Sequence, residues 1–269
     1  MADRSEFAAR YGGWAVVAGA SEGMGAAYAE ELARRGLNLI LIARRAELLE
    51  SLAAQLSKKY NVDAKLILLD LVAANAAEQI HRETNNLEIG LLICNAAFSA
   101  IGPFLERPIQ DHLREIQTNA VTPLKLTYLL AEQMLRRRRG GIVLMSSLSA
   151  FQGSAYISTY AATKAFNIVL AEGLWEEWRR DGVDILVCIS GAVRTPNYVA
   201  SEPVKTGGLG DRTMLPEQVV HEALNALGKQ PYVIPGRINR VASAVMRHLL
   251  PRKSAVKFMG RILREMYVK

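Results

Sequence analysis

The chain has 269 residues, of which 50% are hydrophobic and 7% aromatic. This length accommodates one large α/β domain or two small ones, and the composition excludes intrinsic disorder. The first ten residues carry charges and lack an apolar h-region, so we expect no signal peptide. The sequence contains no uninterrupted run of about 18 apolar residues, so we expect no transmembrane helix.

Cysteine and histidine give no sign of a disulfide framework or a metal centre. Cys94 and Cys188 each lie in an apolar run, where a thiol behaves as a small buried hydrophobe. The four histidines are scattered and form no metal-ligand spacing. We therefore expect a cytoplasmic chain with reduced cysteines and no metal.

The positive charge is concentrated at the C-terminal end. The formal net charge is +7, and residues 236–269 alone carry nine Lys or Arg and one Glu, a net of +8. Subtracting +8 from +7 leaves −1 for residues 1–235. The basicity therefore belongs to a tail, which argues against a nucleic-acid-binding body.

Taken in chain order, apolar runs alternate with helical patterns. Strands are predicted at 14–19, 37–44, 64–71, 89–97, 140–147, 183–190 and 232–234. Helices are predicted at 25–36, 46–60, 74–85, 109–139, with a bend or boundary at 122–124, and 158–182. Such alternation predicts a parallel sheet covered on both faces. We expect a single doubly wound Rossmann-type α/β domain over 1–235, with about seven parallel strands and right-handed crossovers.

A glycine-rich turn follows the first predicted strand and precedes a helix. Its spacing is G-x-x-x-G-x-G, in the sequence Gly19-Ala20-Ser21-Glu22-Gly23-Met24-Gly25. Glycines let the backbone approach a pyrophosphate, and the following helix N-terminus presents free N–H groups to the anion. This context predicts dinucleotide binding, with a purely structural tight turn as the alternative.

The end of the second strand distinguishes between nicotinamide cofactors. NAD-binding proteins carry an acidic residue there, whereas this strand ends in Ala43-Arg44-Arg45. A 2′-phosphate needs positive partners with several donors. We therefore predict NADP(H), with Arg44 as the favoured contact, although a solvated arginine pair would also fit the pattern.

The next two strands end at the same edge of the sheet, where ligands bind in open α/β folds. Asp70, followed by Leu71, either accepts a hydrogen bond from the adenine amino group or caps the next helix. Asn95 is expected to hold the sheet together, while Ala96 and Ala97 line the nicotinamide ribose.

Two tyrosines precede a lysine in the sequence YISTYAATK (156–164). A free phenol has a pKa of about 10, and a nearby ammonium lowers it. Tyr160 and Lys164 share a helix face, whereas Tyr156 has Tyr160 rather than a lysine four residues on and falls in the preceding loop. Ser147 ends a strand at the ligand edge, and period-two alternation turns Ser146 to the other face.

These motifs together resemble the short-chain dehydrogenase/reductase family over about residues 12–200. The matching features are the glycine turn, the 95–97 stretch, Asn119, Ser147, Tyr160-x-x-x-Lys164 and the turn 190–196. The resemblance implies a catalytic tetrad in which Tyr160 donates the proton, Ser147 polarises the carbonyl and Asn119 anchors a water that relays protons to Lys164. It also implies that Lys164 holds the nicotinamide ribose and lowers the tyrosine pKa. Val193 and Thr195 would contact the cofactor, as would the glycine turn through Gly19, Ser21, Gly23, Met24 and Gly25.

The first 50 residues or so also resemble the branch that contains hydroxysteroid and very-long-chain 3-oxoacyl-CoA reductases. This likeness implies a ketone or secondary-alcohol substrate that is lipid-like, steroid-like or a 3-oxoacyl compound. Three residues depart from the family pattern: Ala18 replaces threonine, Ala97 replaces glycine and Ser190 replaces proline. We expect Ser190 to loosen the nicotinamide side, and none of the three removes a catalytic group.

Two segments remain outside the sheet. The polar stretch 197–216 is the expected substrate lid. Residues 236–269 are a basic extension that splits at Pro251 into two amphipathic helices. These helices would cover the cleft, form a subunit interface or lie on an anionic membrane, and packing on the protein is favoured.

The favoured function is an NADP(H)-dependent oxidoreductase that acts on a small carbonyl or alcohol compound, as a homodimer or homotetramer. A regulator or scaffold that binds dinucleotide without catalysis is one alternative. An epimerase or dehydratase on the same fold is another. No nucleic-acid partner is expected.

Overall fold

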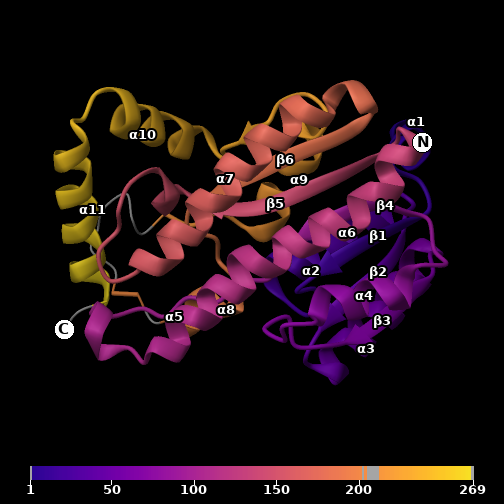
Figure 1. The fold of residues 1–269 in the computed structure, drawn as a ribbon, viewed down its shortest axis with the longest axis horizontal. Coiled ribbons are helices and arrows are strands. Elements are labelled where there is room, and N and C mark those ends of the chain that lie inside the picture. Colours follow the sequence, from indigo (N-terminus) through magenta and orange to yellow (C-terminus); the bar gives the residue numbers. More distant parts are fainter. Residues whose placement is uncertain (1, 202, 205–211, 268–269) are drawn as a thin grey trace.

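A computed structural model of the chain describes residues 2–201, 203–204 and 212–267. Its centre is a sheet of seven parallel strands in the order β3-β2-β1-β4-β5-β6-β7 (Figure 1). The strands are β1 (Trp14–Ala18), β2 (Asn38–Ala43), β3 (Ala64–Leu68), β4 (Ile89–Cys94), β5 (Gly140–Ser147), β6 (Val183–Ser190) and β7 (Tyr232–Val233). The predicted doubly wound α/β fold with about seven parallel strands is confirmed.

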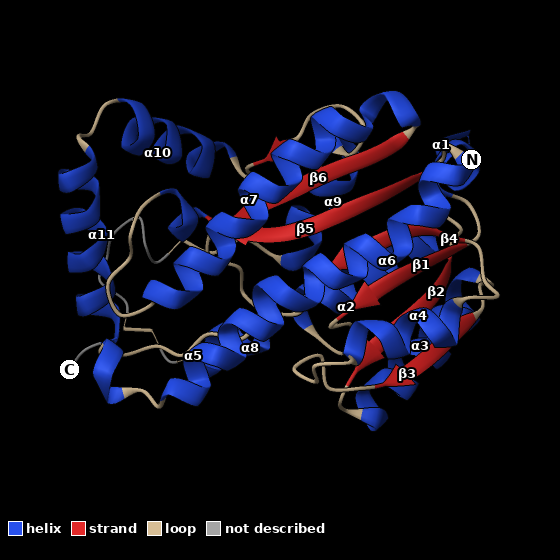
Figure 2. Cartoon of the chain, viewed as in Figure 1, coloured by secondary structure: helices blue, strands red, loops and turns tan. Residues whose placement is uncertain are grey.

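Helices cover both faces of the sheet, as Figure 2 shows. One face packs against α2 (Gly23–Arg34), α3 (Ala46–Tyr60) and α9 (Pro216–Ala226). The other packs against α4 (Ala76–Thr84), α6 (Thr122–Arg137) and α7 (Ser158–Trp178). Ala15 and Val17 contribute to the first core and Val16 to the second, because successive strand residues point to opposite faces.

The predicted helix 109–139 is divided by a short π-helical turn. α5 (Ile109–Ile116) leads into this turn, Gln117–Val121, and α6 then begins at Thr122. Pro123 lies in the first turn of α6, where its missing N–H breaks no helical hydrogen bond. The boundary expected at 122–124 is therefore present.

An N-terminal helix that we did not predict closes one end of the core. α1 (Ala2–Tyr11) ends at Tyr11, whose side chain is buried and donates a 2.7 Å hydrogen bond to Asp184 on β6. Arg10 forms a 2.6 Å ion pair with the same carboxylate. A Cβ on Gly90 would lie 1.4 Å from the Tyr11 carbonyl oxygen, so the glycine allows this close approach.

The extension forms the two predicted helices, α10 (Arg237–His248) and α11 (Arg252–Tyr267), on either side of Pro251. α11 packs on the protein through buried Leu263 and Met266. α10 also packs on the protein, through buried Ser243, but Val241 and Leu249 on its aliphatic face are 65% and 74% exposed. Both helices therefore contact the body of the protein, and the aliphatic face of α10 stays uncovered among the described residues.

Other segments lie at the carboxyl edge of the sheet. They include the 3₁₀ turns Phe104–Glu106 and Leu148–Phe151 and the short helix α8 (Pro196–Ala200). Part of the predicted lid 197–216, namely 202 and 205–211, lies outside the described residues. None of the helices in the described ranges is long and hydrophobic enough to cross a bilayer.

Replacement of Tyr11 by alanine should lower the free energy of unfolding by about 3–5 kcal/mol, because it empties a large buried site. Tyr11→Phe should cost only about 1 kcal/mol, the usual net value of one hydrogen bond. Urea denaturation measures both. Tyr128→Ala, at a site that is 78% exposed, is the control and should change stability by less than about 0.5 kcal/mol. Equal losses for Tyr11→Ala and Tyr128→Ala would contradict the role assigned to α1.

Candidate active site

Glycines of the turn lie where a Cβ atom would clash with neighbouring atoms. A Cβ on Gly25 would lie 1.8 Å from the Gly19 carbonyl oxygen, and a Cβ on Gly19 would lie 2.8 Å from the Ala96 Cα. Gly19 and Gly23 also have positive φ angles, of 86° and 56°. Glu22 precedes α2 without a side-chain cap, so the first N–H groups of the helix stay available to an anion. The turn therefore fits a dinucleotide phosphate.

Asn95 braces this turn from the neighbouring strand. Its side-chain amide donates a 2.9 Å hydrogen bond to the Gly19 carbonyl, and the Ala96 N–H donates to Ala18. Ala97 is exposed just beyond. Ser190 donates a 3.4 Å hydrogen bond to the Ser146 carbonyl, and the expected loosening of the nicotinamide side stays a prediction.

The two arginines after β2 contact different neighbours at the carboxyl edge of the sheet. Arg45, the less favoured candidate, donates a 2.9 Å hydrogen bond to the Ser21 hydroxyl and pairs with Glu22 at 2.7 Å. Arg44 is exposed, 3.5 Å from an Asp70 oxygen. Both guanidiniums therefore lie where the 2′-phosphate of NADP(H) is expected.

The remaining predicted cofactor contacts differ in their exposure to solvent, and Asp70 is exposed. Asp70 accepts a 3.1 Å hydrogen bond from the Val72 N–H in the turn after β3, whereas Asn75 is the N-cap residue of α4, so Asp70 does not cap that helix. Leu71 is buried, as is Met24 in α2.

The turn after β6 approaches the glycine turn from the other side. Val193 is buried and forms an isolated bridge with Met214. Thr195 caps α8 by accepting a 3.2 Å hydrogen bond from Tyr198, and its methyl group would lie 3.0 Å from a Cβ on Gly23. The structure thus brings the predicted turn 190–196 against the glycine turn.

The serines that end β5 point in opposite directions, as predicted. Ser146 is buried and donates a 2.7 Å hydrogen bond to the Lys164 carbonyl on α7. Ser147 accepts hydrogen bonds from the Ser149 N–H at 3.3 Å and from its hydroxyl at 3.1 Å. The Ser147 hydroxyl is also close enough to the Tyr160 phenol to lower the pKa of that tyrosine.

Lys164 lies close to the Tyr160 ring. Its ammonium is 5.5 Å from the Tyr160 ring centroid and donates to the Met145 carbonyl at 3.2 Å. Burial lowers the pKa of Lys164 to about 8. Desolvation raises the pKa of Tyr160 to about 12, Ser147 lowers it, and the charges of Glu115 and Tyr267 raise it further. The lowering of the tyrosine pKa by Lys164 stays a prediction.

Asn119 is fully buried in the π-helical turn and uses its whole side chain in protein contacts. Its amide donates to the Phe98 carbonyl and its oxygen accepts from the Phe98 N–H, both at 2.8 Å. The amide also lies 3.2 Å from the Thr163 hydroxyl. The Asn119 main-chain carbonyl accepts a 3.0 Å hydrogen bond from Asn167, which also donates to the Met145 carbonyl. A water relay through Asn119 remains a prediction.

Sequence reasoning missed two further polar residues of α5. Glu115 is 1% exposed, accepts a 2.7 Å hydrogen bond from the Ala100 N–H, and has its pKa raised by burial. His112 contacts the Thr159 hydroxyl at 2.8 Å and the Phe104 carbonyl at 3.1 Å. Together they tie the loop after β4 to the start of α7. No spacing to Tyr160 indicated them, because they reach the site from a separate helix.

The C-terminal helix lies against the loop that carries Tyr156. Tyr156 has a positive φ of 65° and accepts a 2.9 Å hydrogen bond from the Arg264 guanidinium. The Met266 carbonyl accepts a 3.0 Å hydrogen bond from the Val204 N–H, within the predicted lid 197–216. Tyr267 is close enough to Tyr160 to affect its pKa. The end of α11 therefore lies beside the candidate catalytic residues.

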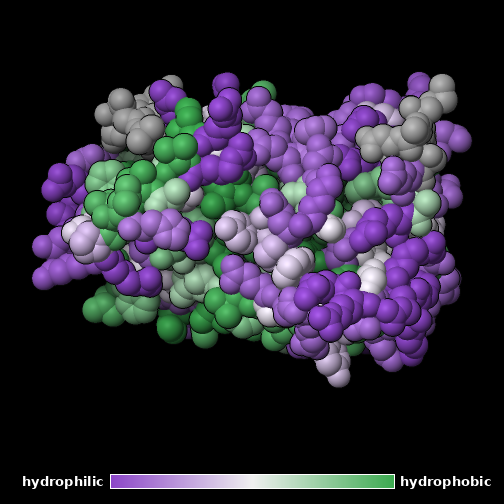
Figure 3. All heavy atoms as spheres, turned by 90° about the horizontal axis from the view of Figure 1, so that it is seen from above, coloured by the Kyte–Doolittle hydropathy of each residue, from purple (hydrophilic) through white to green (hydrophobic). Residues whose placement is uncertain are grey.

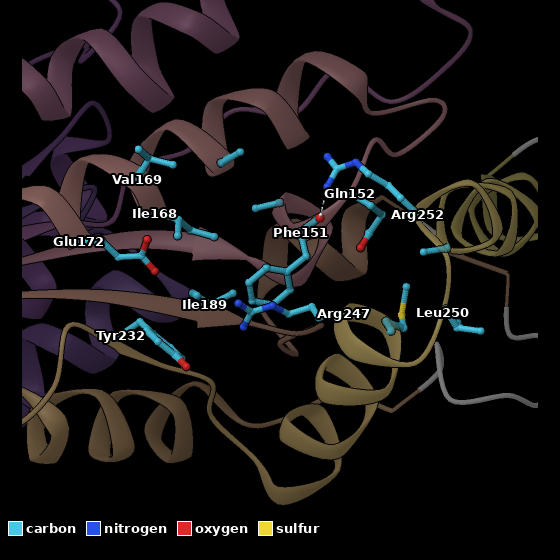
Figure 4. Close-up of a pocket in the computed structure, with 14 residues that line it drawn as sticks. Phe151, Gln152, Ile168, Val169, Glu172, Ile189, Tyr232, Arg247, Leu250 and Arg252 are labelled. Carbon is cyan, nitrogen blue, oxygen red and sulfur yellow. Dashed lines mark hydrogen bonds between the residues drawn. The ribbon is translucent and has the colours of Figure 1, made fainter.

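A separate hollow of about 530 Å³ lies between α7, the end of β6 and the extension (Figure 4). Its lining includes Ile168, Glu172, Tyr232 and Arg247, and none of the predicted catalytic residues. Within the described part of the chain, no three His, Cys, Asp or Glu side chains gather as a metal site would require.

Known proteins share this sequence and architecture. A 7β-hydroxysteroid dehydrogenase of Mediterraneibacter gnavus is 30% identical over 260 residues, 95% of this chain and 98% of the relative. A very-long-chain 3-oxoacyl-CoA reductase of Bos taurus is 31% identical over 96% of this chain and 83% of the relative.

Solved structures agree with these sequence matches. A 7β-hydroxysteroid dehydrogenase structure aligns with a TM-score of 0.89 and 29% identity, over 94% of this chain and 99% of that one. A Sphingobium yanoikuyae short-chain dehydrogenase in complex with NADPH aligns with a TM-score of 0.75 and 28% identity, over 82% and 86% of the two chains. The family profile for short chain dehydrogenases matches residues 13–204. The chain therefore belongs to the short-chain dehydrogenase/reductase family of oxidoreductases.

Proposed function

We propose that the chain is an NADP(H)-dependent oxidoreductase that interconverts a ketone and a secondary alcohol. The observation that carries this proposal is the convergence of Tyr160, Ser147 and Lys164 at the carboxyl end of β5. The glycine turn braced by Asn95 supports dinucleotide binding at the same edge. The Sphingobium relative holds NADPH.

The chemistry follows from the protonation states of these residues. NADPH, when bound, supplies the hydride for carbonyl reduction. Ser147 donates a hydrogen bond to the carbonyl oxygen, and Tyr160 gives its proton to the oxygen as negative charge develops there. A phenol with a pKa of about 12 is protonated at neutral pH, so it is ready to donate. Oxidation of the alcohol would need the phenolate, which burial disfavours.

A hydrophobic substrate best fits the surroundings of Tyr160. The relatives are named for hydroxysteroids and very-long-chain 3-oxoacyl-CoA compounds. α11 places Tyr267 near Tyr160, and buried Leu263 and Met266 fix the helix against the protein. We propose a steroid-like, lipid-like or 3-oxoacyl substrate. A panel of steroids, acyl thioesters and simple ketones tests this class, and a preference for small polar ketones would reject it.

The assembly and location belong to the same proposal. We propose a cytoplasmic homodimer or homotetramer. Exposed apolar side chains on α5, such as Ile109 at 58% and Leu113 at 56%, provide a surface for association. Light scattering of the purified protein measures the mass, and a monomer would reject the proposed assembly.

Tyr160→Phe should lower kcat for ketone reduction by about 10²–10⁴-fold, because it removes the general acid. The affinity for NADPH should stay near that of the unmodified enzyme. Steady-state kinetics and cofactor titration measure the two effects. The matched control is Tyr156→Phe, which removes a hydroxyl that contacts Arg264 rather than a reacting group. Full activity in Tyr160→Phe would reject the proton-donor role and favour a different chemistry on the fold.

Replacement of Arg44 and Arg45 by serine should weaken NADPH binding by about 10–100-fold, the loss of one or two charge-assisted hydrogen bonds. Binding of NADH, which lacks the 2′-phosphate, should change little. Fluorescence titration with each nucleotide measures the affinities, with Arg136→Ser at the remote end of α6 as the control. Tighter binding of NADH than NADPH by the unmodified enzyme would contradict the proposed cofactor.

The rate of reduction should fall as pH rises above about 8. Lys164 has its pKa lowered to about 8, so it is a cation below that pH and loses its charge above it. The profile of kcat/KM against pH should therefore have an alkaline limb near 8. In Lys164→Arg, where the guanidinium keeps its charge, any residual activity should not show this limb. A limb at about 10.4, the ordinary lysine value, would contradict the effect of burial.

A further inference from the structure

The helix α10 exposes an aliphatic stripe that no described part of the chain covers. Ile238, Val241, Val245 and Leu249 are 48%, 65%, 41% and 74% exposed. Their spacing of three and four residues places them on one face of the helix. Figure 3 views the molecule from above, and hydrophobic side chains gather over the half where α10 and α11 lie.

α10 contacts the protein through its other side. Ser243 is buried, and Met246 and Arg247 line the hollow beside α7. The Arg247 guanidinium lies 4.5 Å from the Phe151 ring centroid, and Figure 4 shows the two side chains next to each other. A helix turns about 100° per residue, so Ser243 and Arg247 lie opposite the centre of the aliphatic stripe, and Met246 lies on its flank. The helix is therefore docked by one face while the apolar face is directed outward.

The charge around the stripe is positive. The sequence of α10, RINRVASAVMRH, contains no acidic residue, and residues 236–269 have a net charge of +8. Arg237 at the start of α10 and Lys253 just beyond Pro251 are exposed at opposite ends of the helix. Among the described residues, neither forms an ion pair with a carboxylate, whereas Arg240 pairs with Glu222 at 2.7 Å.

We propose that α10 is a membrane-surface helix that binds an anionic lipid bilayer. Aliphatic residues along one face would enter the headgroup boundary, and the cations at the helix ends would contact acidic headgroups. A second copy of α10 is a poorer partner, because a symmetric contact brings together helices that have only positive charge. The surface lies apart from Tyr160, so membrane binding does not depend on the proposed catalytic function.

The test is flotation of the full-length protein with vesicles, without cofactor or substrate. Vesicles of phosphatidylcholine mixed with phosphatidylglycerol should bind the protein, and vesicles of phosphatidylcholine alone should bind it weakly. Val241→Ser combined with Leu249→Ser should reduce binding by about tenfold or more, because it removes the most exposed part of the stripe. Arg237→Gln combined with Lys253→Gln should reduce binding only to the anionic vesicles.

The control is Leu48→Ser combined with Leu68→Ser, on α3 and at the end of β3. These residues are 43% and 53% exposed and lie near the opposite edge of the sheet from β7. The control should bind vesicles as the unmodified protein does, and circular dichroism should show that every variant is folded. Absence of binding by the unmodified protein would overturn the proposal, as would unchanged binding by the α10 variant. A lower mass of the α10 variant by light scattering, without vesicles, would assign the stripe to contacts between copies and also overturn it.

Discussion

The buried polar contacts around Asn119 hold separate segments of the chain in fixed positions at the carboxyl edge of the sheet. The Asn119 side chain binds the backbone of Phe98 after β4, and its carbonyl is bound by Asn167 of α7. Asn167 and Lys164 both donate to the Met145 carbonyl in β5. A buried group left without a partner costs about 1–3 kcal/mol, so the loop, the strand and the helix cannot move independently. The position of Tyr160, one helical turn before Lys164, follows from this arrangement.

The same burial affects the two ionisable groups of the candidate site in opposite directions. It raises the pKa of the phenol and lowers that of the ammonium, because a low-dielectric surrounding favours the neutral form of each. Two other groups add to this effect through their charge. Glu115 reaches the site from α5 and Tyr267 from α11, and both raise the tyrosine pKa. The extension, which lies beyond the residues that the family profile matches, therefore contributes to the acid–base balance.

Apolar periodicity was enough to predict the strands and most helices, and the motif spacing predicted that the candidate residues lie at one edge of the sheet. Three features depended on contacts that no local pattern reveals. α1 has only two large hydrophobic side chains, Phe7 and Tyr11, and the role of Tyr11 depends on its contacts with Asp184 and the Gly90 backbone. The stripe on α10 was visible in the sequence, but the side of the helix that packs is decided by Ser243 and Arg247. The pKa of Tyr160 depends on burial, which the spacing to Lys164 does not report.

The position of the last described residue has a practical consequence. Tyr267 ends α11 close enough to Tyr160 to alter its pKa, whereas α1 begins at the far end of the sheet (Figure 1). A bulky label attached to the last turn of α11 would therefore lie next to the candidate catalytic residues. A label attached to α1 would lie at the opposite end of the sheet. Labels for activity and vesicle measurements are therefore better placed on α1.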